Sequence, residues 1–131
     1  MYSIQDVSRM TGLSVHTLRY YEKQGLLSRI GRSRGGIRQY SEDDMEELGL
    51  VCCLKNTGMS LQEIARFVRL THEGDTTLRD RVELLHAHRD AMVSRMGEMQ
   101  KHLEKVTCKL HFFSAKLEEY EKKGNGKEGR S

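Results

Sequence analysis

The sequence has no proline and no tryptophan, and aromatic residues make up 6% of its 131 residues. Charged residues make up 31%, a composition typical of a helix-rich protein with long solvated faces. No apolar run approaches the roughly 20 residues that span a bilayer, and the start of the chain lacks the pattern of a signal peptide. We therefore expect a mostly α, cytoplasmic protein with no membrane partner, too short for a large catalytic fold.

Cysteine is also scarce. The three cysteines, Cys52, Cys53 and Cys108, are an odd number in a chain without a secretory signal, which argues against a disulfide framework and predicts at least one free thiol. The chain contains no phosphate-binding glycine loop, nucleophile elbow or metalloprotease helix. We expect no enzymatic activity and no cofactor.

Positive charge gathers at the N-terminus. Residues 1–40 contain seven Lys or Arg and two acidic residues, whereas residues 41–131 contain fifteen basic and seventeen acidic residues. Clustered cations attract phosphates, while mixed charge only solvates a surface. This distribution predicts a head that binds a polyanion, followed by a body that binds a protein partner.

Serine marks the expected helix starts in the head. Ser3 and Asp6 have the spacing of a capping box ahead of a helix over residues 4–10, and Ser14 can cap a second helix that runs to about residue 24. A short segment containing Gly12 separates the two. Two short helices joined by a tight turn predict a helix-turn-helix.

A basic hairpin and two further helices are expected next. Residues 29–40 contain four arginines and three glycines between short apolar positions, which predicts a hairpin with a flexible tip. Ser41 starts a helix that Gly58 closes, and Ser60 starts another over about residues 61–70. We place the boundary of the head, over residues 1–74, in the turn that follows.

The rest of the chain carries one heptad pattern. Thirteen positions step by four and three without a slip, and arginine is the only polar residue among them. They are Leu78, Val82, Leu85, Arg89, Met92, Met96, Met99, Leu103, Val106, Leu110, Phe113, Leu117 and Tyr120. A helix roughly 60 Å long cannot bury this seam against so small a head, which predicts a coiled-coil homodimer through residues 75–121. The Gly- and Lys-rich residues 122–131 are expected to form a disordered tail.

Several residues at the second helix have the properties of a DNA-reading helix. Ser14, His16 and Thr17 lie at its start, where side chains can reach base edges or phosphates. Arg19 supplies a cation, and Tyr20 and Tyr21 supply phenolic donors, although a tyrosine pair on a helix is also common in ordinary packing. With two heads on one dimer, the operator should be a pseudo-palindrome with half-sites about 34 Å apart, or a multiple of that distance.

The sequence resembles the MerR family of transcription regulators over about residues 4–70. The resemblance rests on Ser14–Leu27, on Gly36–Tyr40 and on Asn56–Ile64. It implies a winged helix-turn-helix head, an antiparallel dimerisation coiled coil, and activation of transcription by distorting promoter DNA for RNA polymerase.

The same resemblance assigns roles to individual residues. It implies that Ser14, His16 and Thr17 lie in the major groove of double-stranded promoter DNA and that Arg19 and Tyr20 contact phosphates. It also implies that Arg38 and Tyr40 contact the flanking backbone from the wing. The charge and position of Arg34 at the hairpin tip add it to this set.

The sequence indicates the signal that such a regulator detects less directly than it indicates DNA binding. Metal sensors of this family carry cysteines after the dimerisation helix and near its start, and this chain has neither, so we expect no metal site and keep a metal sensor only as the weakest alternative. Multidrug-responding relatives carry a separate ligand-binding domain, for which about ten residues leave no room. A reversible small molecule at the dimer interface, against the Met-rich seam, stays an alternative.

A thiol is the remaining candidate. Cys53 is followed by Lys55, whose charge lowers a thiol pKa, but it also lies near a helix C-terminus, which raises it. The sequence is similar to the short AdhR- and NmlR-like branch, which responds to aldehydes and nitrosative or thiol stress. That resemblance implies a sensor cysteine at Cys53, with Cys52 as an additional thiol. Both can equally be small buried apolar residues, and a purely structural coiled-coil protein is the competing class.

Overall fold

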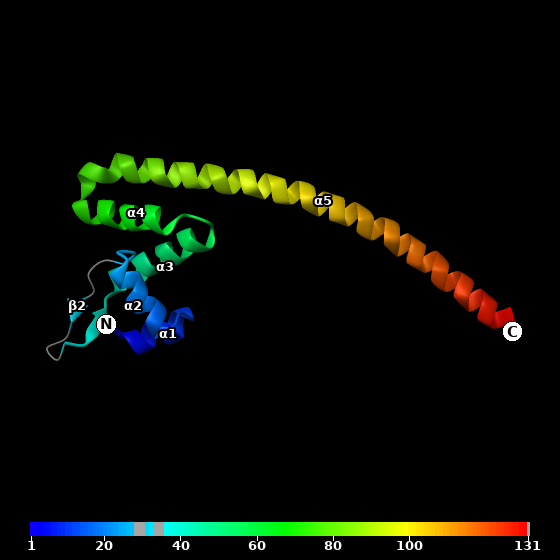
Figure 1. Cartoon of the computed structure of the whole chain (residues 1–131), viewed down its shortest axis with the longest axis horizontal. Helices are drawn as coiled ribbons and strands as arrows, with labels where there is room; N and C mark the ends of the chain where they lie inside the picture. Colours follow the sequence, from blue (N-terminus) through cyan, green and yellow to red (C-terminus); the bar gives the residue numbers. More distant parts are fainter. Residues whose placement is uncertain (28–30, 33–35, 131) are drawn as a thin grey trace. The chain divides into compact units, whose positions relative to one another are not determined.

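The computed structural model describes residues 1–27, 31–32 and 36–130. The elements run in the order β1 (Tyr2–Ser3), α1 (Ile4–Thr11), α2 (Val15–Lys23), β2 (Gly31–Arg32), β3 (Arg38–Tyr40), α3 (Glu42–Asn56), α4 (Leu61–Glu73), a 3₁₀ turn η1 (Asp75–Thr77) and α5 (Leu78–Arg130) (Figure 1). Two compact units are formed, residues 1–88 and residues 89–131. The predicted mostly α class with a winged helix-turn-helix head and a long C-terminal helix is confirmed.

Each of the first four helices starts where a serine caps it. The Ser3 hydroxyl accepts a hydrogen bond from the Asp6 amide at 3.1 Å, and the Asp6 carboxylate accepts one from the Ser3 amide at 3.2 Å. Ser41 and Asp44 form the same box ahead of α3. Ser14 and Ser60 cap α2 and α4 through single side-chain bonds.

The turn between α1 and α2 depends on a glycine. Gly12 ends α1 with a φ of +78°, a left-handed conformation that side chains with a Cβ adopt rarely, and its amide donates to the Ser8 carbonyl at 3.0 Å. This turn brings α1 against α2 and completes the first helix-turn-helix. The predicted helices at the head are confirmed to within a few residues at their ends.

A three-stranded antiparallel sheet in the order β1-β3-β2 stands beside the helices. Gly31 pairs with Gln39 as expected of the hairpin, and Tyr2 pairs with Tyr40 to add the N-terminal strand. The sequence did not indicate β1, because two residues are too short to show strand alternation.

One hydrophobic core, built from residues between Ile4 and Val68, holds the head together. Its fully buried side chains come from every helix of the first helix-turn-helix and of the α3–α4 pair. The largest are Tyr40, Leu18, Leu26, Leu48, Ile64, Val7 and Val51. Because α2 and α3 both contribute to this core, the outward face of α2 has a fixed orientation in the head.

The helix α5 is continuous over 53 residues, about 80 Å at the usual rise. Apart from the partly buried Met92, the apolar side chains of the seam are exposed in the single chain, from 37% at Leu85 to 76% at Tyr120. The helix extends to Arg130 in this structure, and the tail over residues 122–131 stays a prediction. No proline interrupts the backbone ladder, and an ion pair between Lys122 and Glu118 at 3.7 Å joins the last turns to the preceding ones. No described helix is long and apolar enough to cross a membrane.

Truncation of the core should be costly. We predict that Leu18→Ala lowers the free energy of unfolding of the head by about 2–5 kcal/mol, because Leu18 is completely buried and its loss leaves a cavity. Urea denaturation followed by circular dichroism measures the change. Met10→Ala, at a 59% exposed position, should change it by about 0.5 kcal/mol or less. Equal costs for the two variants would contradict the packing described.

Candidate nucleic-acid interface

The first turn of α2 presents polar groups to solvent. Ser14 and His16 are exposed and Thr17 is partly buried. The Ser14 hydroxyl accepts from the Thr17 amide at 3.0 Å and donates to the Thr17 hydroxyl at 2.9 Å, which holds the two side chains together. A helix N-terminus carries partial positive charge, so this turn offers hydroxyls and an imidazole beside a surface suited to phosphate.

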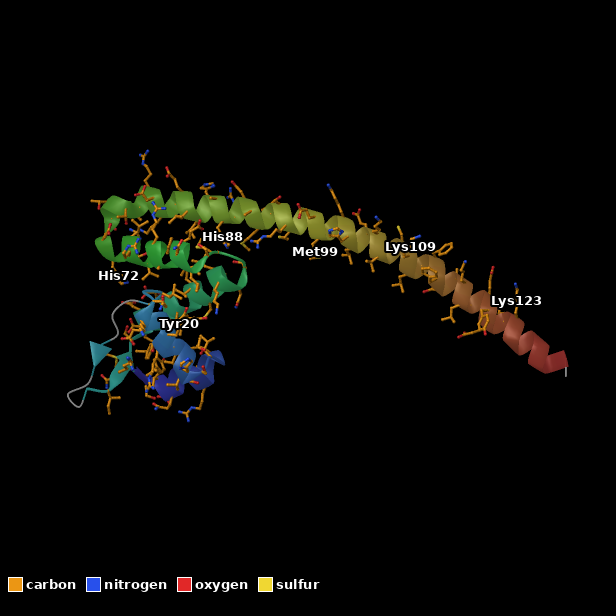
Figure 2. The ribbon with its side chains drawn as sticks, viewed as in Figure 1. Tyr20, His72, His88, Met99, Lys109 and Lys123 are labelled. Carbon is orange, nitrogen blue, oxygen red and sulfur yellow. The ribbon has the colours of Figure 1, made fainter. Side chains whose placement is uncertain are left out.

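The following turn adds a cation and a phenol on the same outward side. Arg19 is exposed. Tyr20 is 44% exposed, and Figure 2 labels it. Leu18 and Tyr21 point the other way, with 0% and 2% of their surfaces exposed. The helix is therefore clearly two-sided, and its buried side determines which residues a duplex can meet.

Tyr21 belongs to the supporting layer rather than to the surface. Its hydroxyl accepts a hydrogen bond from the Lys55 ammonium at 2.7 Å, and that ammonium lies 5.0 Å from the centre of the Tyr21 ring. The hydrogen bond to Tyr21 raises the pKa of Lys55. A cation from α3 thus fastens the inner face of α2, and we leave Tyr21 out of the proposed contact surface.

The strand next to α2 is tied to it by an ion pair. Arg38 Nε lies 2.6 Å from Glu22 Oε2, and the two side chains are 24% and 18% exposed. Glu22 lies on α2 and Arg38 on β3, so the pair sets the distance between the helix and the wing. The Arg38 side chain keeps some exposed surface that a phosphate can contact, but the Glu22 carboxylate already compensates part of its charge.

Tyr40 is fully buried, contrary to the surface position that the resemblance implied. Its side chain is 0% exposed, and its hydroxyl has no hydrogen-bond partner in the described part of the chain. Burial raises the pKa of Tyr40, and the Glu22 carboxylate raises it further. Packing is therefore its role in this structure. Arg34 lies outside the described residues.

The candidate sensor cysteines differ in exposure. Cys53 is exposed near the end of α3, while Cys52 is partly buried and packs against the core. Burial raises the pKa of the Cys52 thiol, an effect that nearby Lys55 partly opposes. Cys108 is exposed on α5. Exposure therefore distinguishes the two adjacent thiols in a way that their sequence could not.

A groove of about 690 Å³ runs between α3 and α4. Its lining includes the apolar Leu50, Val51 and Phe67 together with carboxylates of α3. Across it, His72 Nε2 lies 3.1 Å from Glu47 Oε1. The sequence did not indicate this groove, because its lining comes mainly from two helices, and on each helix the lining residues are interspersed with residues of the core. Within the described residues no three His, Cys, Asp or Glu side chains are grouped to hold a metal.

Comparison with protein families gives two matches. The model described as "MerR HTH family regulatory protein" matches residues 2–71. The model described as "MerR, DNA binding" matches residues 45–106. Together they cover the head and the first half of α5.

Individual relatives agree. An HTH-type transcriptional regulator of Haemophilus influenzae is 37% identical over 112 residues, covering 86% of this chain and 83% of the relative. The regulator AdhR of Bacillus subtilis is 34% identical over 91 residues, covering 70% and 65%. The crystal structure of HiNmlR, a MerR family regulator lacking the sensor domain and bound to promoter DNA, superposes with a TM-score of 0.80 at 36% identity, covering 86% of this chain and 90% of that one. The chain therefore belongs to the MerR family of helix-turn-helix transcription regulators and is similar to its AdhR- and NmlR-like members.

Proposed function

We propose that this regulator works as a homodimer that places α2 of each copy in the major groove of a pseudo-palindromic promoter site and distorts the DNA between them for RNA polymerase. The two-sided character of α2 carries this proposal. Ser14, His16 and Arg19 face outward from a helix whose inner face is buried, which is the geometry of a groove-reading helix. HiNmlR, which is bound to promoter DNA, supports the same use of the fold.

The dimer follows from the seam of α5. Its apolar side chains continue from Leu78 to Tyr120 and, apart from the partly buried Met92, are between 37% and 76% exposed in one chain. A stripe of this length is larger than the apolar patches that monomers expose, and pairing with a second copy buries it. Two-fold symmetry then carries two copies of α2 to two half-sites.

For the signal, we propose that reactive electrophiles such as aldehydes or nitrosothiols modify Cys53. Its exposure favours attack over the partly buried Cys52. With an aldehyde, the thiolate forms a bond to the carbonyl carbon and the oxygen takes a proton, giving a hemithioacetal. With a nitrosothiol, the nitroso group passes to the thiolate and the donor leaves as its own thiolate.

A reversible small molecule is the second candidate for the signal. The groove between α3 and α4, with its volume of about 690 Å³ and apolar residues in its lining, supports it. This groove lies within the head, whereas the sequence suggested a site against the methionines of the seam. A response that survives loss of Cys53 favours this alternative.

The DNA contact is tested at Arg19. Arg19→Ala should weaken binding to all duplexes alike and reduce the slope of log affinity against log salt by about 1, because one phosphate contact is lost. Fluorescence anisotropy over a salt series measures both. Arg95→Ala, the same change on α5, is the control and should have no effect. Unaltered affinity and slope for Arg19→Ala would refute the assignment of α2.

The dimer is tested on the seam. Leu103→Glu places two carboxylates in the apolar interface and should shift the chain from dimer to monomer at micromolar concentration, as measured by sedimentation equilibrium. Lys101→Glu changes charge on an exposed neighbouring position outside the seam and should leave the dimer intact. A wild-type chain that sediments as a monomer would contradict the proposal directly.

The thiol is tested by three serine variants in transcription from the target promoter. Cys53→Ser should abolish the response to formaldehyde and to S-nitrosoglutathione while DNA affinity stays unchanged, because the nucleophile is lost and the interface is not touched. Cys52→Ser and Cys108→Ser should respond as the wild type does. A full response from Cys53→Ser would remove the thiol from the proposal.

A further inference from the structure

The last turn of α3 is the meeting point of contacts from two other helices. Lys55 on this turn donates a hydrogen bond to the Tyr21 hydroxyl of α2 at 2.7 Å. Thr57, the residue that caps α3, has its Oγ1 2.7 Å from Nε2 of His88 on α5 (His88 is labelled in Figure 2). Cys53 lies on the same turn. One short segment therefore contacts the DNA-facing helix on one side and the start of the long helix on the other.

The direction of the hydrogen bonds at Thr57 can be derived. A hydroxyl has one hydrogen, and the Thr57 hydroxyl lies 2.7 Å from the Cys53 carbonyl oxygen, with the Leu54 carbonyl farther away at 3.3 Å. The carbonyl can only accept, so when Thr57 donates to Cys53 its oxygen accepts from His88 in the tautomer that carries its hydrogen on Nε2. A continuous relay results, from His88 Nε2–H through the Thr57 hydroxyl to the backbone carbonyl of Cys53.

The relay is compatible with both charge states of His88. The neutral tautomer that carries its hydrogen on Nε2 donates to Thr57, and so does the imidazolium. The Thr57 amide also donates to the Cys53 carbonyl, at 3.1 Å, so this one backbone oxygen accepts from both the amide and the hydroxyl of Thr57.

The second contact transmits movement of the same turn to α2. Tyr21 is 2% exposed, so its side chain is closely packed and moves when the groups packed against it move. Lys55 is two residues from both Cys53 and Thr57, and its carbonyl accepts from the Gly58 amide at 3.2 Å. A shift of this turn therefore moves the cation that fastens the inner face of α2, while Arg19 and Tyr20 lie on the outer face.

We propose that Thr57 and His88 are positioning residues that connect the start of α5 to the DNA-reading helix through the last turn of α3, with the Cys53 carbonyl as the connecting atom. This inference rests on the proposed function, since it assigns to that turn the link between modification of Cys53 and distortion of DNA. An adduct on the Cys53 side chain changes the packing of its own backbone, which alters the relay to α5 and the Lys55 contact to α2 together.

The coupling is tested first without any electrophile, by hydrogen exchange on the full chain. Thr57→Val keeps the branched shape and removes the hydroxyl, and His88→Leu removes the donor. Each should speed exchange about threefold or more in the last turn of α3 and in α2, although neither residue touches α2. Thr57→Ser, which keeps the hydroxyl, should resemble the wild type.

Thr71→Val is the matched control. The Thr71 hydroxyl donates to the Phe67 carbonyl at 3.0 Å in the same four-residue pattern. Its loss should affect α4 and leave α2 unchanged. If His88→Leu altered exchange only within α5, or if Thr71→Val reproduced its effect on α2, the relay would be refuted.

A second readout separates coupling from a merely structural role. The duplex is one that the wild-type chain selects from a random library, with 2-aminopurine at its centre to report distortion. Thr57→Val and His88→Leu should keep affinity within about twofold of the wild type and lose the fluorescence change that formaldehyde induces. The double variant should lose no more than either single variant, because both interrupt one relay.

The outcomes distinguish the two proposals. A wild-type fluorescence response that survives Cys53→Ser refutes thiol sensing, while the exchange experiment still decides whether the relay exists. A response abolished by Cys53→Ser but unchanged in Thr57→Val and His88→Leu refutes the relay and leaves thiol sensing intact. Affinity lost in parallel with stability in both variants assigns them a structural role only and also refutes the relay.

Discussion

The burial of Leu18 and Tyr21 in the core of the head is the constraint on which the functional arrangement depends. These two side chains are 0% and 2% exposed, so α2 cannot rotate about its axis without opening the core. Serine caps and the turn at Gly12 form the helix, but packing decides that Arg19 and Tyr20 face outward. The residues that α2 can present to DNA are therefore determined by the residues that its opposite face buries.

Polar contacts then connect α2 to other elements of the head. The Glu22–Arg38 pair joins α2 to the wing, and Lys55 joins it to α3. Partly buried ion pairs of this kind contribute little net stability but fix geometry, because an alternative arrangement leaves a charge without its partner. A regulator that changes the shape of DNA needs small displacements in one part of the head to reach the helix that contacts DNA. The polar contacts of α2 with the wing and with α3 can transmit such displacements.

Local features of the structure could be predicted from the sequence, and long-range ones could not. Helix starts at Ser14 and Ser41 depend on hydrogen bonds to residues three positions away, and the seam of α5 depends on spacing alone. The Lys55–Tyr21 and Thr57–His88 contacts join residues 34 and 31 positions apart, for which a sequence contains no periodic signal. The same limit explains Tyr40, whose burial is decided by its pairing with β1 and by the helices beside the sheet.

The central claim, that a two-fold dimer reads the major groove with α2, is tested most directly by methylation interference at guanine N7 on the duplex that the chain selects. N7 lies in the major groove, where a helix meets base edges. The account predicts two interference patches on the same face of the duplex, related by two-fold symmetry and about 34 Å or a multiple of it apart. Interference confined to one patch, or methylation that leaves binding unaffected at every guanine while adenine N3 methylation in the minor groove blocks it, would contradict the claim.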